Sequence, residues 1–202
     1  PAISVRDSSF SSIKRAISVF LGRNRGDMEL WIQTKFPVIG DSAMVGFKLE
    51  LEPALDSLEL TFAKQEKPRV SIVIPVYNEY RMTIFCLQSL LETTSGVDYE
   101  VILADDASSD LTSTIGERIH GLEIVRTDEN LGFLNNCKNG ASHARGEYIL
   151  FLNNDTAFTE GWLSHLVATL ERDPKAGIAG PVLIFGRGSL QEAGGIIWKD
   201  AS

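Results

Sequence analysis

The stretch VSIVIPVYNE, residues 70–79, decides how the rest of the chain is read. Its first seven residues are nearly all apolar, and most of them are β-branched. A short apolar run without alternation predicts a strand that is buried on both faces. The run then stops at Tyr77, Asn78 and Glu79, whose side chains suit either a surface turn or a ligand site. The remainder of the chain has to separate these two interpretations.

The chain downstream repeats this pattern of apolar runs separated by helix-like stretches. Further strands are expected at residues 100–104, 122–126 and 147–152. Helices are expected from about residue 81, after a cap at Ser109 or Asp110, and after a cap at Thr159. Alternating strands and helices predict an α/β fold, in which a mostly parallel sheet carries helices on both faces. Turn residues after Gly177 predict a closing hairpin or an edge strand.

Residues 1–67 follow a different pattern. Apolar and polar residues alternate at Phe47–Leu51 and Leu58–Phe62, which is typical of an antiparallel β-pair with one exposed face. Upstream, apolar residues recur at helical spacing, at Phe10, Ile13, Ile17, Phe20 and Leu21. The polar stretch AKQEKPR marks a boundary near Lys67. We therefore expect an N-terminal appendage at residues 1–67, made of a helix and a β-pair, and a main domain at residues 68–202.

The charge of the chain bears on its partners. A formal net charge of −8 argues against nucleic acid, because proteins that bind nucleic acid usually carry a basic face. The charge is uneven, since residues 1–25 hold five basic side chains and one acidic one. A basic amphipathic helix at residues 8–25 is typical of peripheral contact with an anionic membrane surface. A helix packed on its own protein would show the same pattern, and we favour it because the apolar stripe is short.

Cysteine usage and hydropathy indicate a cytoplasmic protein. Cys86 and Cys137 lie in helix-like segments and form no metal-ligand pattern, so both are expected to be free thiols. No apolar run reaches the roughly 18 residues that a membrane-spanning helix needs. The expected location is the cytoplasm, or the inner face of the cell membrane if residues 8–25 contact lipid.

Polar side chains follow three of the expected strands. They are Asn78 and Glu79 after the first strand, Asp105 and Asp106 after the second, and residues 153–155 (Asn-Asn-Asp) after the fourth. In an open parallel sheet, ligands bind just beyond the carboxyl ends of the strands. Turn chemistry alone explains one such cluster, but like charges that share a crevice repel each other unless a cation or a donor-rich ligand compensates them. The sequence therefore predicts a ligand site at this edge.

The kind of ligand follows from what the first strand-to-helix turn lacks. PVYNEYR, residues 75–81, contains no glycine, so it is not the G-x-G-x-x-G loop of a dinucleotide site, and no segment matches a P-loop. Carboxylates at the crevice instead suggest that a divalent cation joins the protein to phosphate. Oxygen ligands from Asp and Asn suit Mg²⁺ or Mn²⁺.

Four segments, in this order, resemble the family 2 inverting glycosyltransferases, which have a GT-A-type, Rossmann-like fold. They are VSIVIPVYNE (70–79), ADDASSD (104–110), NLGF (130–133) and GEYILFLNNDT (146–156). The resemblance covers about residues 70–202. The form LNND, followed by GPVLI (180–184) and LQEAGGIIW (190–198), is most similar to the rhamnosyltransferase-type branch of bacterial cell-surface polysaccharide synthesis.

The resemblance implies that the substrate is a nucleotide-sugar donor and assigns roles at its base end. Pro75 and Tyr77 would lie beside the nucleoside, with Tyr77 stacked on the base, and Glu79 would lie near the nucleotide. Asp106, with Asp105 beside it, would accept a hydrogen bond from the base, since an ionised carboxylate is only an acceptor.

At the other end, the resemblance places Asn154 and Asp155 in the family's Asp-x-Asp-like motif. Asp155 would bind the Mn²⁺ or Mg²⁺ held by the diphosphate, and Asn154 would contact the ribose or the sugar. Two of the three residues at this strand end are amides, unlike the commonest form of the motif, so one formal negative charge is expected there.

The implied reaction transfers a sugar, with inversion, to a hydroxyl of a glycan or lipid-linked acceptor. The family's catalytic base lies further downstream, and neither Glu192 nor Asp200 falls in a matching segment, so we expect the base beyond residue 202. Two alternatives stay open. A sugar-phosphate nucleotidyltransferase would need a Gly-rich basic loop after the first strand, which the chain lacks, and a non-catalytic sugar-nucleotide-binding module would need no base.

Overall fold

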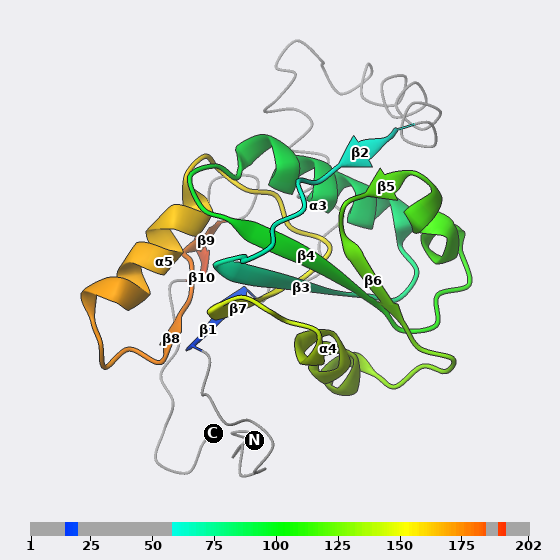
Figure 1. Cartoon of the computed structure of the whole chain (residues 1–202). Helices are drawn as coiled ribbons and strands as arrows, with labels where there is room; N and C mark the ends of the chain where they lie inside the picture. Colours follow the sequence, from blue (N-terminus) through cyan, green and yellow to red (C-terminus); the bar gives the residue numbers. More distant parts are fainter. Residues whose placement is uncertain (1–14, 20–57, 185–189, 193–202) are drawn as a thin grey trace.

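A computed structural model of the protein describes residues 15–19, 58–184 and 190–192. Six strands form the main sheet in the order β6-β4-β3-β7-β1-β8, and every neighbouring pair runs parallel (Figure 1). In chain order the strands are β1 (Arg15–Val19), β3 (Val70–Val76), β4 (Tyr99–Asp105), β6 (Glu123–Arg126), β7 (Tyr148–Leu152) and β8 (Ile178–Ala179). The prediction of a mostly parallel α/β sheet is confirmed.

Helices cover both faces of the sheet (Figure 1). On one face lie α3 (Tyr80–Thr93) and α5 (Trp162–Arg172), and on the other lies α4 (Phe133–Ser142). A 3₁₀ helix, η1 (Leu111–Glu117), follows β4. Two short ladders complete the description: β2 (Leu60–Thr61) with β5 (Ile119–His120), and β9 (Leu183–Ile184) with β10 (Leu190–Glu192). The second ladder is antiparallel, as in the hairpin that was one of the two alternatives expected after Gly177.

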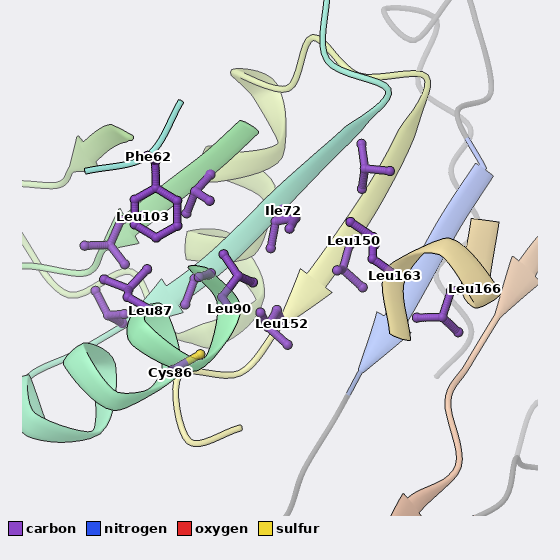
Figure 2. Packing of buried hydrophobic residues seen from close by; sticks show 14 of the residues in the cluster. Phe62, Ile72, Cys86, Leu87, Leu90, Leu103, Leu150, Leu152, Leu163 and Leu166 are labelled. Carbon is purple, nitrogen blue, oxygen red and sulfur yellow. The ribbon is translucent and has the colours of Figure 1, made fainter. Parts of the chain in front are cut away.

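The main core lies between the sheet and helices α3 and α5. Strand β3 is buried at every position because β4 and β7 flank it and helices cover both its faces. Its Ile72 lies near Leu150 of β7 and Leu90 of α3, all fully buried (Figure 2). Burying one such side chain contributes roughly 1.5–3 kcal/mol. This core fixes the strands whose carboxyl ends carry the candidate site.

The opposite face is thinner, and α4 lies close against it. A Cβ atom added to Gly140 of α4 would lie 2.7 Å from Val73 Cγ1 and 2.9 Å from Ala104 Cβ. These separations are shorter than ordinary van der Waals contact, so only glycine allows the helix to sit at this depth. The start of α4, which begins at the end of the NLGF segment, is held near the carboxyl end of β4, where Asn136 Nδ2 donates to the Ala104 carbonyl at 2.7 Å.

Two helix starts differ from the expectation. The stretch after Asp110 is a 3₁₀ helix, although Asp110 caps it as predicted by accepting the Thr112 N–H at 2.9 Å. Thr159 was predicted to cap the last helix, but α5 begins at Trp162 with Gly161 as its N-cap. Gly161 has a left-handed backbone, φ 74°, which glycine adopts without steric cost. Trp162 itself is only half-buried, stacked on Phe158.

The N-terminal helix prediction is wrong over residues 15–19. Arg15–Val19 form a strand that pairs in parallel with β7 on one side and β8 on the other. The helical spacing of the apolar residues was misleading here. The segment also contains β-branched residues, which favour a strand, and its partner strands lie far away in sequence, where local spacing does not reveal them. The amphipathic helix on which membrane contact depended is therefore interrupted here, and the rest of residues 8–25 lies outside the described residues.

The predicted antiparallel β-pair is also corrected in part. Leu60–Thr61 form a strand, but they pair in parallel with Ile119–His120 of β5. The other predicted member, Phe47–Leu51, lies outside the described residues. The boundary near Lys67 stays a prediction. Among the described residues, no helix combines the length and apolar character needed to cross a membrane.

Candidate functional site

The backbone bends sharply where β3 ends. Asn78 and Glu79 have left-handed backbones, with φ of 58° and 60°, a conformation that costs a non-glycine residue roughly 1–2 kcal/mol. Tyr77, just before the bend, keeps 53% of its surface exposed, whereas Pro75 is buried opposite Ala104 of β4. The bend therefore leaves an exposed aromatic side chain at the sheet edge.

Asn78 ties the β3 turn to the β4 turn. Its Oδ1 accepts the N–H groups of Ser109 at 2.8 Å and Asp110 at 3.2 Å, and its own N–H donates to Ser108 Oγ at 2.7 Å. A further bond joins the same two turns, because the Asp110 side chain accepts the Tyr80 N–H at 3.0 Å. Burial opposes ionisation of Asp110, but the hydrogen bonds from Thr112 and Tyr80 outweigh it and lower the pKa of the carboxyl group. These bonds stabilise the strained bend.

Asp105 is held inside the protein. Only 1% of its surface is exposed. Its Oδ1 accepts the Ser108 N–H at 2.9 Å, and its Oδ2 forms an ion pair with Arg126 at the end of β6. The Arg126 guanidinium also donates to the Ser108 carbonyl at 2.6 Å. The structure therefore gives Asp105 the role of fixing the turn and bringing the β6 end to the β4 end.

Asp106 holds the NLGF segment in place. Its Oδ1 accepts the Leu131 N–H at 2.7 Å and its Oδ2 accepts the Gly132 N–H at 3.0 Å, while 3% of the residue is exposed. Thr127 Oγ1 lies 3.4 Å from the same carboxylate. Gly132, with φ 78°, is the N-cap of α4. Asp106, which was expected to accept a hydrogen bond from the nucleoside base, thus fixes the start of this helix.

The β7 end forms a compact turn against α3. Thr156 Oγ1 donates to the Asn153 carbonyl at 2.9 Å, and the Cys86 thiol lies 3.6 Å from the same oxygen. Asn154 Nδ2 donates to Thr83 Oγ1 at 3.0 Å. Asp155 is half-buried, with its Oδ1 inside the protein.

The Asp155 carboxylate affects the pKa of the Cys86 thiol, which lies beneath this turn. Burial raises the pKa of Cys86 to about 12, a hydrogen bond with the Thr156 backbone opposes that rise, and the negative charge of Asp155 adds to it. Asp155 therefore lies close to α3 as well as at the sheet edge.

Three of the strand ends are joined in one network. Asn78, Ser108, Asp105 and Arg126 connect β3, β4 and β6 by hydrogen bonds, and α3, which begins next to Glu79, connects this network to the β7 turn. Because β4, β3 and β7 are parallel neighbours, these ends lie at one edge of the sheet. The predicted residues are thus gathered at the edge where a ligand was expected.

Some residues of this network were not predicted from the sequence. Ser108 and Arg126 make their contacts across strands, so no local spacing marked them. Thr83 and Cys86 look like ordinary helix residues in the sequence. Asn78 gave a signal, since it stands in the same polar cluster as Glu79.

The described residues offer a small donor set for a metal ion. Among them, no group of three or more His, Cys, Asp or Glu side chains gathers as a metal site. A Mg²⁺ or Mn²⁺ ion usually takes one or two protein carboxylates and completes its shell with phosphate and water. The donor chemistry of Asp155 fits that minimal arrangement, with amide neighbours in place of further carboxylates.

A parallel α/β sheet with polar side chains gathered at its carboxyl edge defines the class of fold that binds ligands there. Within that class, the sequence profile of glycosyl transferase family 2 matches residues 71–198. The chain therefore belongs to glycosyl transferase family 2, and it carries a glycosyltransferase domain with the GT-A-like α/β fold.

Two relatives illustrate the match. The protein named MT1568, from Mycobacterium tuberculosis, is 32% identical over 126 residues, which cover 61% of this chain and 39% of that protein. The O-antigen biosynthesis protein RfbC of Myxococcus xanthus is 30% identical over 164 residues, covering 78% of this chain and 12% of that protein. The chain thus spans less than two fifths of the length of these relatives.

Solved structures resemble the fold more distantly. The structure of S. aureus TarS residues 1–349 in complex with UDP-GlcNAc has a TM-score of 0.47 and 24% sequence identity. The similar region covers 52% of this chain and 31% of the TarS chain.

Proposed function

We propose that this domain binds a nucleotide sugar at the carboxyl edge of β3, β4 and β7, and that the whole protein transfers the sugar to an acceptor hydroxyl with inversion. The observation that carries the proposal is the bonded network at this edge, which holds an exposed tyrosine at one end and a carboxylate turn at the other. Membership of glycosyl transferase family 2 supports the donor class.

The base of the donor would lie against Tyr77. The exposed ring offers a flat surface for stacking, and Tyr77 lies between the buried Pro75 and the bend at Glu79. An ionised carboxylate has about four acceptor positions. Asp106 therefore retains capacity to accept a hydrogen bond from the base while it holds Leu131 and Gly132, and Asp105 keeps the turn rigid.

The diphosphate of the donor would lie at the β7 turn. Asp155 would bind Mn²⁺ or Mg²⁺ there, and Asn154 would face the ribose or the sugar. When bound, the cation offsets the charge that develops on the departing diphosphate. The part of this chain is to hold the Asp155 turn rigidly, through the Asn153 carbonyl and the Thr83 hydroxyl.

The acceptor side completes the proposed reaction. A carboxylate beyond residue 202 would remove the proton of the attacking hydroxyl, a contribution of roughly 10²–10⁴-fold in rate. A glycan or lipid-linked acceptor in bacterial cell-surface polysaccharide synthesis, handled by a rhamnosyltransferase-type enzyme, is the specific assignment. The similarity to a protein named for O-antigen biosynthesis supports that setting.

Calorimetric titration tests the proposal. The full chain is titrated with UDP, GDP and dTDP, each with and without Mn²⁺. We expect one nucleotide to bind most tightly, Mn²⁺ to strengthen it, Tyr77→Ala to weaken it with or without Mn²⁺, and Asp155→Ala to remove only the gain from Mn²⁺. Asp98→Ala is the matched control, because Asp98 is exposed and precedes β4 at the other edge of the sheet. Nucleotide binding that is unchanged by both Tyr77→Ala and Asp155→Ala would contradict the assignment.

A further inference from the structure

Helix α3 carries a stripe of short polar side chains on its buried side. Thr83, Cys86 and Ser89 are spaced three residues apart, so they lie along one face of the helix. At most 1% of each is exposed. Short polar groups that are buried in an apolar face need hydrogen-bond partners. Their partners show what the stripe does.

The three side chains contact one loop, the segment after β7. Thr83 Oγ1 accepts the Asn154 side-chain amide at 3.0 Å, and the Cys86 thiol lies 3.6 Å from the Asn153 carbonyl. One turn further along α3, Ser89 Oγ accepts the Phe158 N–H at 3.0 Å. The loop thus runs along the stripe and is bonded to it at each step.

Just past the helix, the same loop is fastened once more. Thr94 Oγ1 accepts the indole N–H of Trp162 at 3.0 Å, and Trp162 stacks on Phe158 with ring centroids 4.3 Å apart. The loop is therefore anchored to α3 from its first residue to the start of α5, although it lies outside any helix or strand.

Thr83 also connects the two ends of the proposed donor site. Its hydroxyl donates to the Glu79 carbonyl at 3.3 Å while it accepts from Asn154. Glu79 belongs to the bend that follows Tyr77, and Asn154 adjoins Asp155. A single hydroxyl group thus bridges the bend on the base side and the turn on the diphosphate side.

We infer that Thr83, Cys86 and Ser89 are positioning residues for the Asp155 turn. They set how strongly a divalent cation joins the donor diphosphate to the protein, and they do so without touching the donor. The inference rests on the proposed function, since it requires that Asp155 acts through a cation. A purely structural stripe would affect stability and all ligands alike.

The test compares isosteric substitutions in calorimetric titrations of the full chain. For each variant, the Kd is measured without Mn²⁺ and with saturating Mn²⁺, and the ratio is the gain from the metal. The probe is whichever of UDP, GDP and dTDP the wild type binds most tightly. Thr83→Val keeps the shape and removes the hydroxyl. We expect it to reduce this gain by about fivefold, the effect of one lost hydrogen bond. The Mn²⁺-free Kd should stay within about twofold of the wild type, because the Thr83 backbone N–H still donates to the Glu79 carbonyl at 3.1 Å and holds the bend.

Two further variants isolate the cause. Thr83→Ser retains the hydroxyl and should restore the wild-type gain. Thr169→Val on α5 is the matched control, because Thr169 Oγ1 donates to a carbonyl of its own helix at 2.8 Å and lies away from the turn. Cys86→Val, which enlarges the side chain beneath the turn, should reduce the gain as well, so the test does not depend on Thr83→Val folding.

The outcomes separate this inference from the proposed function. If Asp155→Ala removes the gain from Mn²⁺ while Thr83→Val and Cys86→Val keep it, the positioning role is overturned and the proposed site stands. Equal weakening of both Kd values in Thr83→Val and Cys86→Val would also overturn it, because a merely structural stripe predicts that result. If the wild-type Kd for UDP, GDP and dTDP ignores Mn²⁺, the metal assignment falls and this inference falls with it.

Discussion

Glu79 has an unusual backbone conformation for the start of a helix. It occupies the N-cap of α3 with a left-handed backbone, yet its side chain makes no capping hydrogen bond. Most helices would place Ser, Thr, Asp or Asn there in an extended conformation. The strain persists because neighbouring bonds define the bend: the Thr83 N–H donates to the Glu79 carbonyl at 3.1 Å, and Asn78 holds the β4 turn.

Replacing Glu79 by glycine should separate strain from function. Glycine adopts a left-handed backbone freely, so Glu79→Gly should raise the free energy of unfolding by about 1 kcal/mol in urea titrations. The same variant should bind nucleotide more weakly, because it loosens the bend that carries Tyr77. Glu79→Gln keeps the strain and should leave the stability unchanged. A glycine variant less stable than the wild type would contradict this account.

Glu100 links the stability of the fold to pH. It is buried at the start of β4, where its carboxylate accepts Ser71 Oγ at 2.6 Å and the Arg145 N–H at 2.8 Å. Burial alone would raise its pKa, but the bonds from Ser71 and Arg145 and the charge of Arg145 lower it below the ordinary value of 4.5. The ionised form is therefore favoured in the folded state.

The sign of the pH dependence follows from that lowered pKa. Because the folded state holds the proton less tightly than the unfolded state, the contribution of Glu100 is complete above about pH 4.5 and is lost as the pH falls below it. In urea titrations at a series of acidic pH values, the wild type should lose more stability than Glu100→Gln does. Parallel profiles for the two proteins would rule this contribution out.

Helix α4 is distinguished by how closely it approaches the sheet. Gly140 would normally be a weak point, since alanine is favoured over glycine inside a helix by about 1 kcal/mol. Here the added methyl group would press on Val73 and Ala104. The steric cost of overpacking, roughly 1–3 kcal/mol, should exceed the helical gain.

Gly140→Ala should therefore destabilise the protein, against its helix propensity. Thermal or urea unfolding measures the change, and Lys138→Ala, an exposed substitution two residues earlier on α4, is the control. Because α4 begins at the segment held by Asp106, the Gly140 variant should also weaken nucleotide binding. A stabilised Gly140→Ala variant would show that the helix shifts without cost.

Two thiols report on the two faces of the sheet. Cys86 lies in the core under α3, and Cys137 is buried on α4. Burial raises their pKa values to about 12 and about 11, so neither should react with a thiol reagent at neutral pH in the native state.

Both thiols should become reactive together as urea unfolds the protein. One sheet joins the two faces, so a single cooperative transition is expected. Labelling of the single-thiol variants Cys86→Ser and Cys137→Ser follows each face separately. Two well-separated midpoints would show that the face covered by α4 unfolds on its own.

The sequence predicted the alternating part of this molecule well, for a physical reason. In β3, β4 and β7, a strand that is buried on both faces has to be apolar throughout, so the pattern is visible locally. The polar clusters after these strands likewise predicted the edge at which Tyr77, Asp106 and Asp155 lie.

What local pattern missed was decided by contacts between distant segments. Arg15–Val19 became a strand because β7 and β8 supply its hydrogen bonds, and they lie more than a hundred residues away. Ser108 and Arg126 join the site network through partners on other strands. The same holds for the internal bonds of Asp106, whose partners in the NLGF segment reveal a structural task beside the one that the family resemblance implies.

The position of β1 determines how far the N-terminus can be shortened. It sits between β7 and β8, so the earliest described residues are woven into the interior of the sheet instead of forming its rim. A recombinant version that starts at residue 58 would not merely lose a tail. It would leave a gap in the sheet between β7 and β8 and remove the strand that pairs with both. A shortened version for crystallisation should therefore retain Arg15–Val19.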